Sequence, residues 1–145
     1  MTEASFAGFA HPALPTVDEI RAWALDPYST APEWRHWDLT LATDELAEVW
    51  LELAADPTCP KRSFALHVLY IYSGDAVRTR FRVHTRKRVD KLLDKAQETR
   101  DQYVGLWVEN TKALIRQPDL FDYDEWCNGG LVRRPRRLNA DRRRR

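Results

Sequence analysis

The chain has little cysteine and little glycine, and each shortage excludes a class of site. Its 145 residues include two cysteines, Cys59 and Cys127, and neither belongs to a Cys-x-x-Cys pair. Two isolated cysteines cannot build a disulfide framework, and they lack the spacing of zinc or thioredoxin-like sites. Five glycines are present, and none forms a Gly-rich phosphate-binding loop. We therefore expect no metal and no cofactor.

Long apolar runs are also missing. The longest, Phe64–Tyr72, is interrupted by His67 and is far short of the roughly 20 residues that a membrane-spanning helix needs. Residues 1–16 carry no cluster of basic side chains, and glycine and proline interrupt their apolar residues. That pattern is unlike a signal peptide. We expect a soluble protein that is cytoplasmic and has no membrane partner.

Charge is abundant but sorted into blocks of alternating sign. Residues 1–60 carry 2 basic and 11 acidic side chains, and residues 61–100 carry 11 basic and 4 acidic ones. Residues 101–132 carry 2 basic and 6 acidic side chains, and residues 133–145 carry 8 and 1. The formal net charge of +1 therefore hides a dipolar chain. Such asymmetry bears on partners and solubility rather than on the fold.

The helix signals favour an all-α protein. Hydrophobic residues make up 43% of the chain and six of them are tryptophans, which suits a packed core. Between residues 16 and 130, apolar residues repeat at helical spacing and Asp-Pro or Gln-Pro pairs end the segments. We expect capping boxes at residues 16–19, 30–33 and 99–102, with further caps at Thr43 and Thr85.

These signals predict an irregular bundle of about six helices with a buried central helix near residues 60–80. Residues 63–72 would be apolar on every side if helical, as in a helix surrounded by others. One alternative is an α+β fold with a hairpin at residues 65–84, because residues 77–84 alternate apolar and basic or polar side chains. A second alternative is HEAT-like stacked helix pairs, suggested by two similar segments that each lead from Asp-Glu to Trp and Asp-Pro.

The domain organisation follows from these signals. Residues 1–15 are predicted to be an N-terminal extension and residues 16–130 a single helical domain. Residues 131–145 are Arg-rich and poor in apolar side chains, so we expect a disordered tail.

Two basic segments are the candidate binding sites. Clustered cations bind phosphate backbones by releasing counterions. Alternatively, residues 78–95 pair with the acidic residues 1–60 of the same chain, and the tail is functionally neutral. No base-reading motif accompanies either segment. The candidate polyanion-binding residues are Arg78, Arg80, Arg82, Arg86, Lys87, Arg88, Arg133, Arg134, Arg136 and Arg137.

The leading functional hypothesis is a small non-enzymatic interaction protein that binds a macromolecular partner, most simply another protein. The first alternative is sequence-nonspecific nucleic-acid binding through residues 78–95 and the Arg-rich tail. The second alternative is an enzyme with an acid/base pair at His67 and Asp75. These residues are eight positions apart and share a face of the predicted helix. A polar pair inside an apolar helix is more often a satisfied core interaction.

Overall fold

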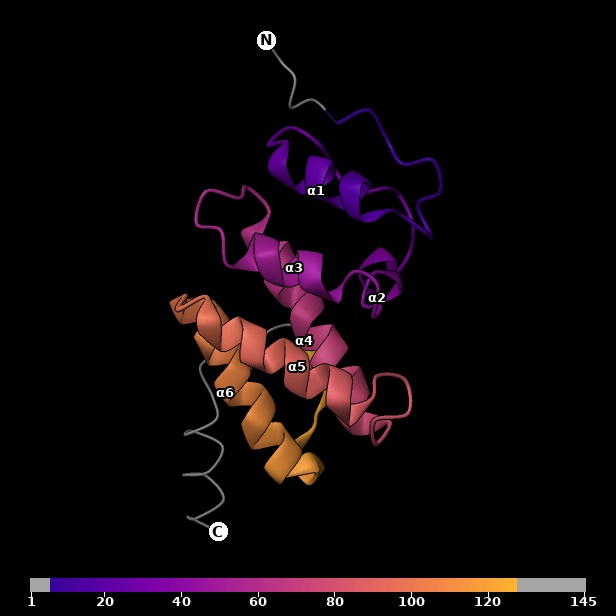
Figure 1. The fold of residues 1–145 in the computed structure, drawn as a ribbon. Coiled ribbons are helices and arrows are strands. Elements are labelled where there is room, and N and C mark those ends of the chain that lie inside the picture. The colour runs from indigo at the N-terminus through magenta and orange to yellow at the C-terminus, as the bar shows by residue number, and fades with distance from the viewer. Residues whose placement is uncertain (1–5, 128–145) are drawn as a thin grey trace.

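The computed structural model describes residues 6–127 and is all-helical over that range (Figure 1). It has seven α-helices and one short 3-10 helix, and no strand among the described residues. The elements are α1 (Val17–Leu25), α2 (Trp37–Thr40), α3 (Ala47–Ala54), α4 (Arg62–Arg78), α5 (Arg86–Glu98), α6 (Gln102–Arg116), η1 (Pro118–Leu120) and α7 (Tyr123–Cys127). The all-α prediction is confirmed. None of these helices is long and apolar enough to cross a membrane.

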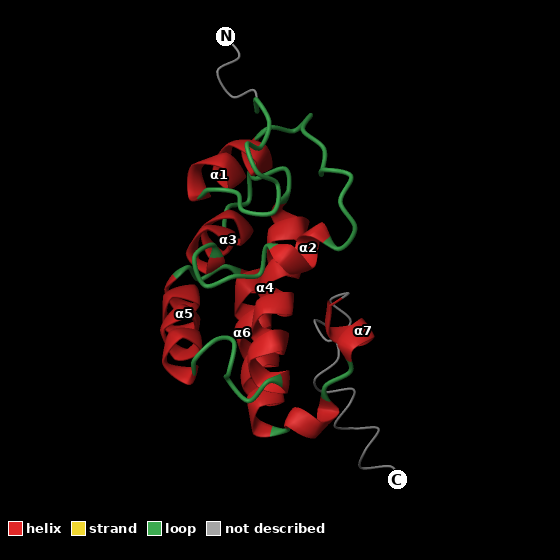
Figure 2. Cartoon of the chain, turned by 90° about the vertical axis from the view of Figure 1, so that its right-hand side faces the viewer, coloured by secondary structure: helices red, strands yellow, loops and turns green. Residues whose placement is uncertain are grey.

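Helix α4 lies at the centre, as predicted. It contacts α2, α3, α5, α6 and α7, and Figure 2 shows it running beside α6 with α7 against its flank. Val68, Leu69 and Ile71 on α4 are 0% exposed. Units of a helical repeat contact only their neighbours along the chain, whereas α4 contacts five other helices. The architecture is therefore an irregular bundle.

The hairpin alternative is wrong. Residues 65–78 belong to α4, and the alternating segment that suggested a strand becomes the end of this helix and the loop before α5. Its apolar residues do not share a face: Val77 is buried in the last turn of α4, whereas Val83 is 52% exposed. Phe81 folds back so that its backbone N–H donates to the carbonyl oxygen of Ala76 at 2.7 Å.

Two of the predicted caps are confirmed and two capping boxes are wrong. Thr16 and Glu19 form the predicted capping box on α1, and the Thr85 side chain caps α5. At α6 the cap is Asp101, whose backbone is extended and whose side chain accepts from the Tyr103 and Val104 N–H groups. Thr99 still has helical backbone angles at the end of α5, and its hydroxyl donates to the Ala96 carbonyl.

No helix begins at Thr30. The backbone carbonyl of Thr30 accepts a hydrogen bond from the Trp23 indole at 3.0 Å, and the next helix starts only at Trp37. Thr43 is a partial success, since its hydroxyl accepts from the Leu46 N–H at 3.3 Å just before α3.

Tryptophan indoles connect the loops to the core. The indole of Trp37 donates to the Pro12 carbonyl at 2.9 Å, and that of Trp50 donates to the Leu41 carbonyl at 3.0 Å. Residues 6–15, the described part of the predicted extension, thus contact the domain. The indole of Trp126 on α7 donates to the Tyr70 carbonyl, and this close approach requires Gly74. A Cβ at Gly74 would lie 2.5 Å from the Trp126 ring.

Candidate functional site

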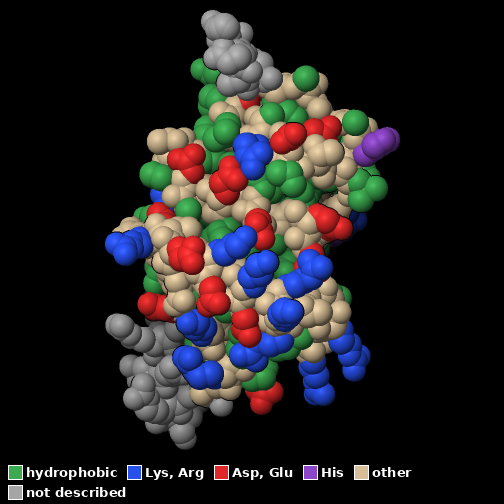
Figure 3. Space-filling view, in the orientation of Figure 1, with side chains coloured by type: hydrophobic (Ala, Val, Ile, Leu, Met, Phe, Trp, Pro, Cys, Tyr) green, Lys and Arg blue, Asp and Glu red, His purple; other side chains and the backbone are tan. Residues whose placement is uncertain are grey.

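The basic residues between Arg78 and Lys95 lie at the end of α4, in the α4–α5 loop and on α5. In Figure 3, Lys and Arg side chains gather on the half of the molecule that contains α5. On the half that contains α1 and α3, the charged side chains in view are mostly Asp and Glu. The charge blocks of the sequence therefore become two regions in space.

Four basic side chains of this region have a carboxylate partner. Arg78 pairs with Asp75 at 2.9 Å and Arg86 pairs with Asp90 at 3.0 Å, both within the basic block. The other two partners come from residues 1–60. Lys95 pairs with Glu48 at 2.9 Å, and Arg88 lies 3.8 Å from Asp44.

The remaining cations of the loop and of α5 have no carboxylate partner among the described residues. These are Arg80, Arg82, Lys87 and Lys91, and all four are exposed. We call them the unpaired basic surface. Intramolecular pairing with residues 1–60 was one interpretation of the basic block. In residues 6–127 that pairing involves Arg88 and Lys95 together with His84, and it leaves the unpaired basic surface untouched.

The loop that carries Arg80 and Arg82 has an unusual backbone. Arg80 and Phe81 are consecutive residues with positive φ values of 56° and 63°. The left-handed region is uncommon for bulky side chains and costs free energy. The Arg86 guanidinium lies 5.4 Å from the centre of the Phe81 ring, which connects the loop to α5. The chain thus holds the arginines of the loop in a defined turn.

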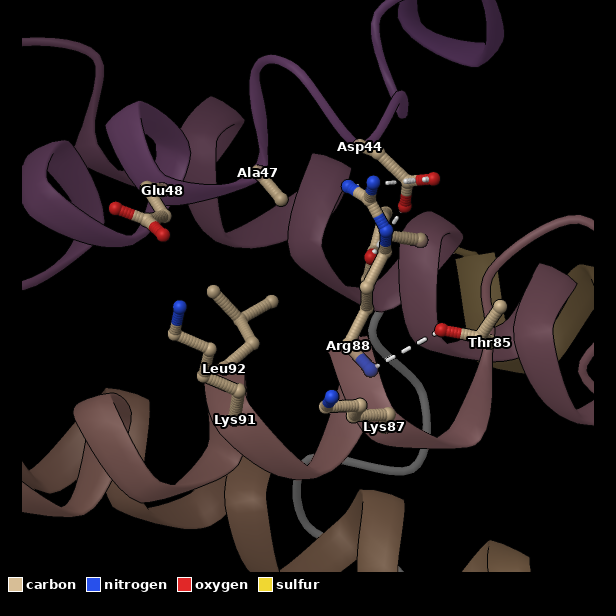
Figure 4. A pocket seen from close by; sticks show the side chains of 9 residues that line it. Asp44, Ala47, Glu48, Thr85, Lys87, Arg88, Lys91 and Leu92 are labelled. Carbon is tan, nitrogen blue, oxygen red and sulfur yellow. Dashed lines mark hydrogen bonds and ion pairs between the residues drawn. The ribbon is translucent and has the colours of Figure 1, made fainter.

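A pocket of about 400 Å³ lies between α3 and the first turns of α5 (Figure 4). Lys87 and Lys91 lie on its α5 side, opposite Asp44, Ala47 and Glu48. Thr85 caps α5 there and no acidic residue stands in the first turn of that helix. Helix N-termini attract anions, so two unpaired lysines at this end strengthen the positive potential.

Asp44 is the centre of a polar cluster beside this pocket. Its Oδ1 accepts hydrogen bonds from the Tyr72 hydroxyl at 2.7 Å and pairs with His84 Nδ1 at 2.9 Å. The Tyr72 and His84 rings are stacked with their centroids 3.8 Å apart. Burial, reinforced by the hydrogen bond to Asp44, raises the pKa of Tyr72, so this phenol stays protonated and donates.

Sequence reasoning missed this cluster. Its members come from three separate segments, and no spacing rule connects residues 44, 72 and 84. His84 was counted only as the last member of an alternating pattern. Its burial, with 6% of its surface exposed, was the signal that the sequence alone could not supply.

His67 and Asp75 do not form the acid/base pair that we considered. Eight residues of helix separate them by about 12 Å along the axis. His67 Nε2 pairs instead with Asp38 Oδ2 at 2.8 Å, and Asp75 pairs with Arg78. The first pair connects α4 to α2 and the second lies within α4, so neither interaction brings His67 and Asp75 together.

Two further candidate groups were a metal-binding cluster and the Cys59 thiol. No group of three or more His, Cys, Asp or Glu side chains is placed to hold a metal ion in that range. The Cys59 thiol is buried, and desolvation raises its pKa, which disfavours the reactive thiolate. The predicted tail residues Arg133, Arg134, Arg136 and Arg137 lie outside the described residues.

Comparison with known proteins identifies no relative. No protein-family model, no curated protein and no solved structure matches this chain.

Proposed function

We propose that this protein is a non-enzymatic binding protein whose partner is nucleic acid, held through its phosphate backbone by the unpaired basic surface. The observation that carries the proposal is the lack of carboxylate partners for Arg80, Arg82, Lys87 and Lys91 within residues 6–127. Exposed like charges repel one another and contribute no stability on their own. A polyanion that supplies the missing negative charge would remove this repulsion and release its own counterions.

The paired cations beside the unpaired basic surface enlarge the area that could contact phosphates. Arg78, Arg86 and Arg88 are held by Asp75, Asp90 and Asp44, yet all three remain exposed beside the unpaired ones. Guanidinium groups still have donors free for phosphate oxygens after one carboxylate contact. The residues extend from the last turn of α4 over the loop to the second turn of α5.

The acidic half of the molecule would restrict where a polyanion can bind. Residues 1–60 hold 11 of the 22 acidic side chains, and they would repel a phosphate backbone. Binding would therefore place the polyanion against the α4–α5 loop and α5 and away from α1 and α3. A cytoplasmic location remains part of this proposal.

The test is a binding titration of the full chain with a labelled oligonucleotide, measured by fluorescence anisotropy between about 50 and 200 mM salt. We expect the logarithm of the affinity to fall linearly with the logarithm of salt concentration, with a slope of about −0.9 per phosphate contact on duplex DNA. The double variant Lys87→Gln/Lys91→Gln should weaken binding and flatten this slope. A suitable control is Arg35→Gln/Lys112→Gln, which removes the same charge from two exposed residues outside the basic surface.

Two outcomes would contradict the proposal. The first is no measurable binding of DNA or RNA near 50 mM salt, where electrostatic contacts are strongest. The second is equal weakening by the lysine variant and by its control, which would show that net charge alone governs binding. An acidic protein would then be the better candidate for the partner.

A further inference from the structure

A shallow hollow of about 480 Å³ lies at the α4–α5 loop and is lined by three arginines. Arg78, Arg80 and Arg82 contribute its charge, and Thr79 and Val83 complete it. No carboxylate lines this hollow. Guanidinium groups match phosphate oxygens in geometry and charge. Phosphate is therefore the ligand group that this hollow suits.

A second hollow of about 410 Å³ adjoins the first, because Arg78 and Arg80 line both. Its other walls are mainly apolar and include Phe81, Ile115 and Phe121. Phe81 and Phe121 are partly buried against the core, so their rings are positioned rather than free. A volume of this size is within the range of small-ligand pockets.

The second hollow contains one carboxylate, and this carboxylate gives the two hollows different ligand preferences. Asp119 lines the apolar hollow and is absent from the arginine-lined one. A carboxylate repels phosphate but accepts hydrogen bonds from the exocyclic amino groups of bases. Phosphate is thus directed to the arginines, and the flat face of a base to the aromatic side.

The strained turn at Arg80 and Phe81 joins these two hollows. Both residues have positive φ. Arg80 supplies a cation and Phe81 an aromatic ring to the lining of the second hollow. Strain of this kind persists where the surrounding structure holds it and is concentrated at functional sites.

From this juxtaposition we infer that the protein selects single-stranded nucleic acid. An unpaired base enters the apolar hollow while its phosphates lie on Arg78, Arg80 and Arg82. A duplex keeps its bases stacked inside and can offer only phosphates, whereas single strands combine phosphate contacts with stacking on aromatic side chains. This inference rests on the proposed function, since it specifies the nucleic acid that the same surface binds.

The experiment compares three ligands with the full-length protein by fluorescence anisotropy at one salt concentration. The ligands are a labelled mixed-sequence single strand of about 12 nucleotides, the same strand annealed to its complement, and a strand of equal phosphate count in which every base is replaced by an abasic site. We expect the single strand to bind at least about fivefold more tightly than the abasic strand, because one stacked base contributes that much or more. It should also bind more tightly than the duplex.

The variant Phe81→Leu separates stacking from a general effect on the fold. It should reduce the ratio of single-strand to abasic affinity towards one, because the aromatic stacking surface is removed while the three arginines remain. Tyr28→Leu is the matched control, since Tyr28 is 89% exposed and lies in the acidic half of the chain. A loss of abasic binding in Phe81→Leu would indicate a disturbed loop. In that case, the ratio of single-strand to abasic affinity measured with wild-type protein tests the inference without any substitution.

The outcomes distinguish this inference from the proposed function. Equal affinity of wild-type protein for the base-bearing and abasic strands would overturn the inference and leave the proposed function standing. Tighter binding of the duplex than of the single strand would overturn it as well. If none of the three ligands binds, the proposed function fails and the inference fails with it.

Discussion

Cations near the acidic half and cations of the α4–α5 loop have different surroundings. Arg21 is held by Glu52 at 2.8 Å, and Arg62 pairs with Asp101 and donates to the Ala54 carbonyl. The Lys61 ammonium donates to the carbonyl oxygens of Trp23 and Asp26 and to the Ser29 hydroxyl. Arg80 and Lys87, by contrast, have no such acceptor among the described residues.

This difference separates stability from binding. A cation that satisfies backbone carbonyls and a partly buried carboxylate stabilises the fold, and its removal leaves polar groups unpaired. An exposed cation without a partner adds little stability and can even reduce it by repulsion. One set of basic side chains therefore holds helices together, and the other set is the one to which we assign binding in our proposal.

The largest expected effect comes from the core that both halves share. Leu69 on α4 is 0% exposed, so Leu69→Ala should lower the free energy of unfolding by about 2–5 kcal/mol, the usual range for such a truncation. Urea denaturation followed by circular dichroism measures this. A nearly neutral result would contradict the central position of α4.

The next largest loss of stability is expected on removing a partly buried ion pair, compared with removing an exposed one. Arg62 and Asp101 side chains are 22% and 14% exposed, and Asp101 also caps α6. Arg62→Met keeps the aliphatic stem but leaves Asp101 and the Ala54 carbonyl without their donor, at a cost of about 1–3 kcal/mol. The control is Arg21→Met, whose pair with Glu52 is more exposed and should matter by less than about 1 kcal/mol. Equal losses in the two variants would contradict this distinction.

Acid should weaken the N-terminal half first. Hydrogen bonds from the backbone N–H groups of Ala10 and Thr16 lower the pKa of Glu19, and a hydrogen bond from the Phe6 N–H lowers the pKa of Asp26. Carboxyls with a lowered pKa in the folded state stabilise it above their unfolded pKa of about 4, and this contribution is lost as pH falls through the folded value. Hydrogen-exchange protection factors should therefore fall in α1 before α6 as the pH is lowered below about 4. Simultaneous loss of protection in both helices would contradict the comparison.

The smallest expected effect on stability is in the unpaired basic surface. Lys87→Gln/Lys91→Gln should change the free energy of unfolding by less than about 0.5 kcal/mol, because neither side chain has a carboxylate partner in residues 6–127. Thermal melting in the absence of any ligand checks this. A large loss of stability would assign these lysines to the fold rather than to binding.

The sequence predicted the helices better than it predicted their contacts. The apolar coverage of residues 63–72 was enough to place α4 at the centre, and Thr16 and Thr85 identified two helix starts because side-chain capping is a local interaction. Thr99 failed because its backbone is still helical at the end of α5, whereas an N-cap residue is extended, as Asp101 is. The alternation at residues 77–84 failed because tertiary packing placed Val77 inside and Val83 outside.

The candidate site was predictable only in composition. The basic block identified Arg80, Arg82 and Lys87 as candidates, but long-range pairing decides which cations remain unpaired, and Asp44 and Glu48 come from a distant segment. The apolar hollow needed Phe81, Ile115 and Phe121 from three places in the chain. No periodicity connects those positions, so the aromatic half of the site could not be predicted.

The most direct measurement of the central claim is a titration of the isotope-labelled protein with a single-stranded oligonucleotide, followed residue by residue through amide chemical shifts. We expect saturable shifts in the last turn of α4, the α4–α5 loop and the first two turns of α5, with α1 and α3 nearly unchanged. Shifts concentrated in α1 and α3, or no shifts at about 50 mM salt, would contradict the central claim.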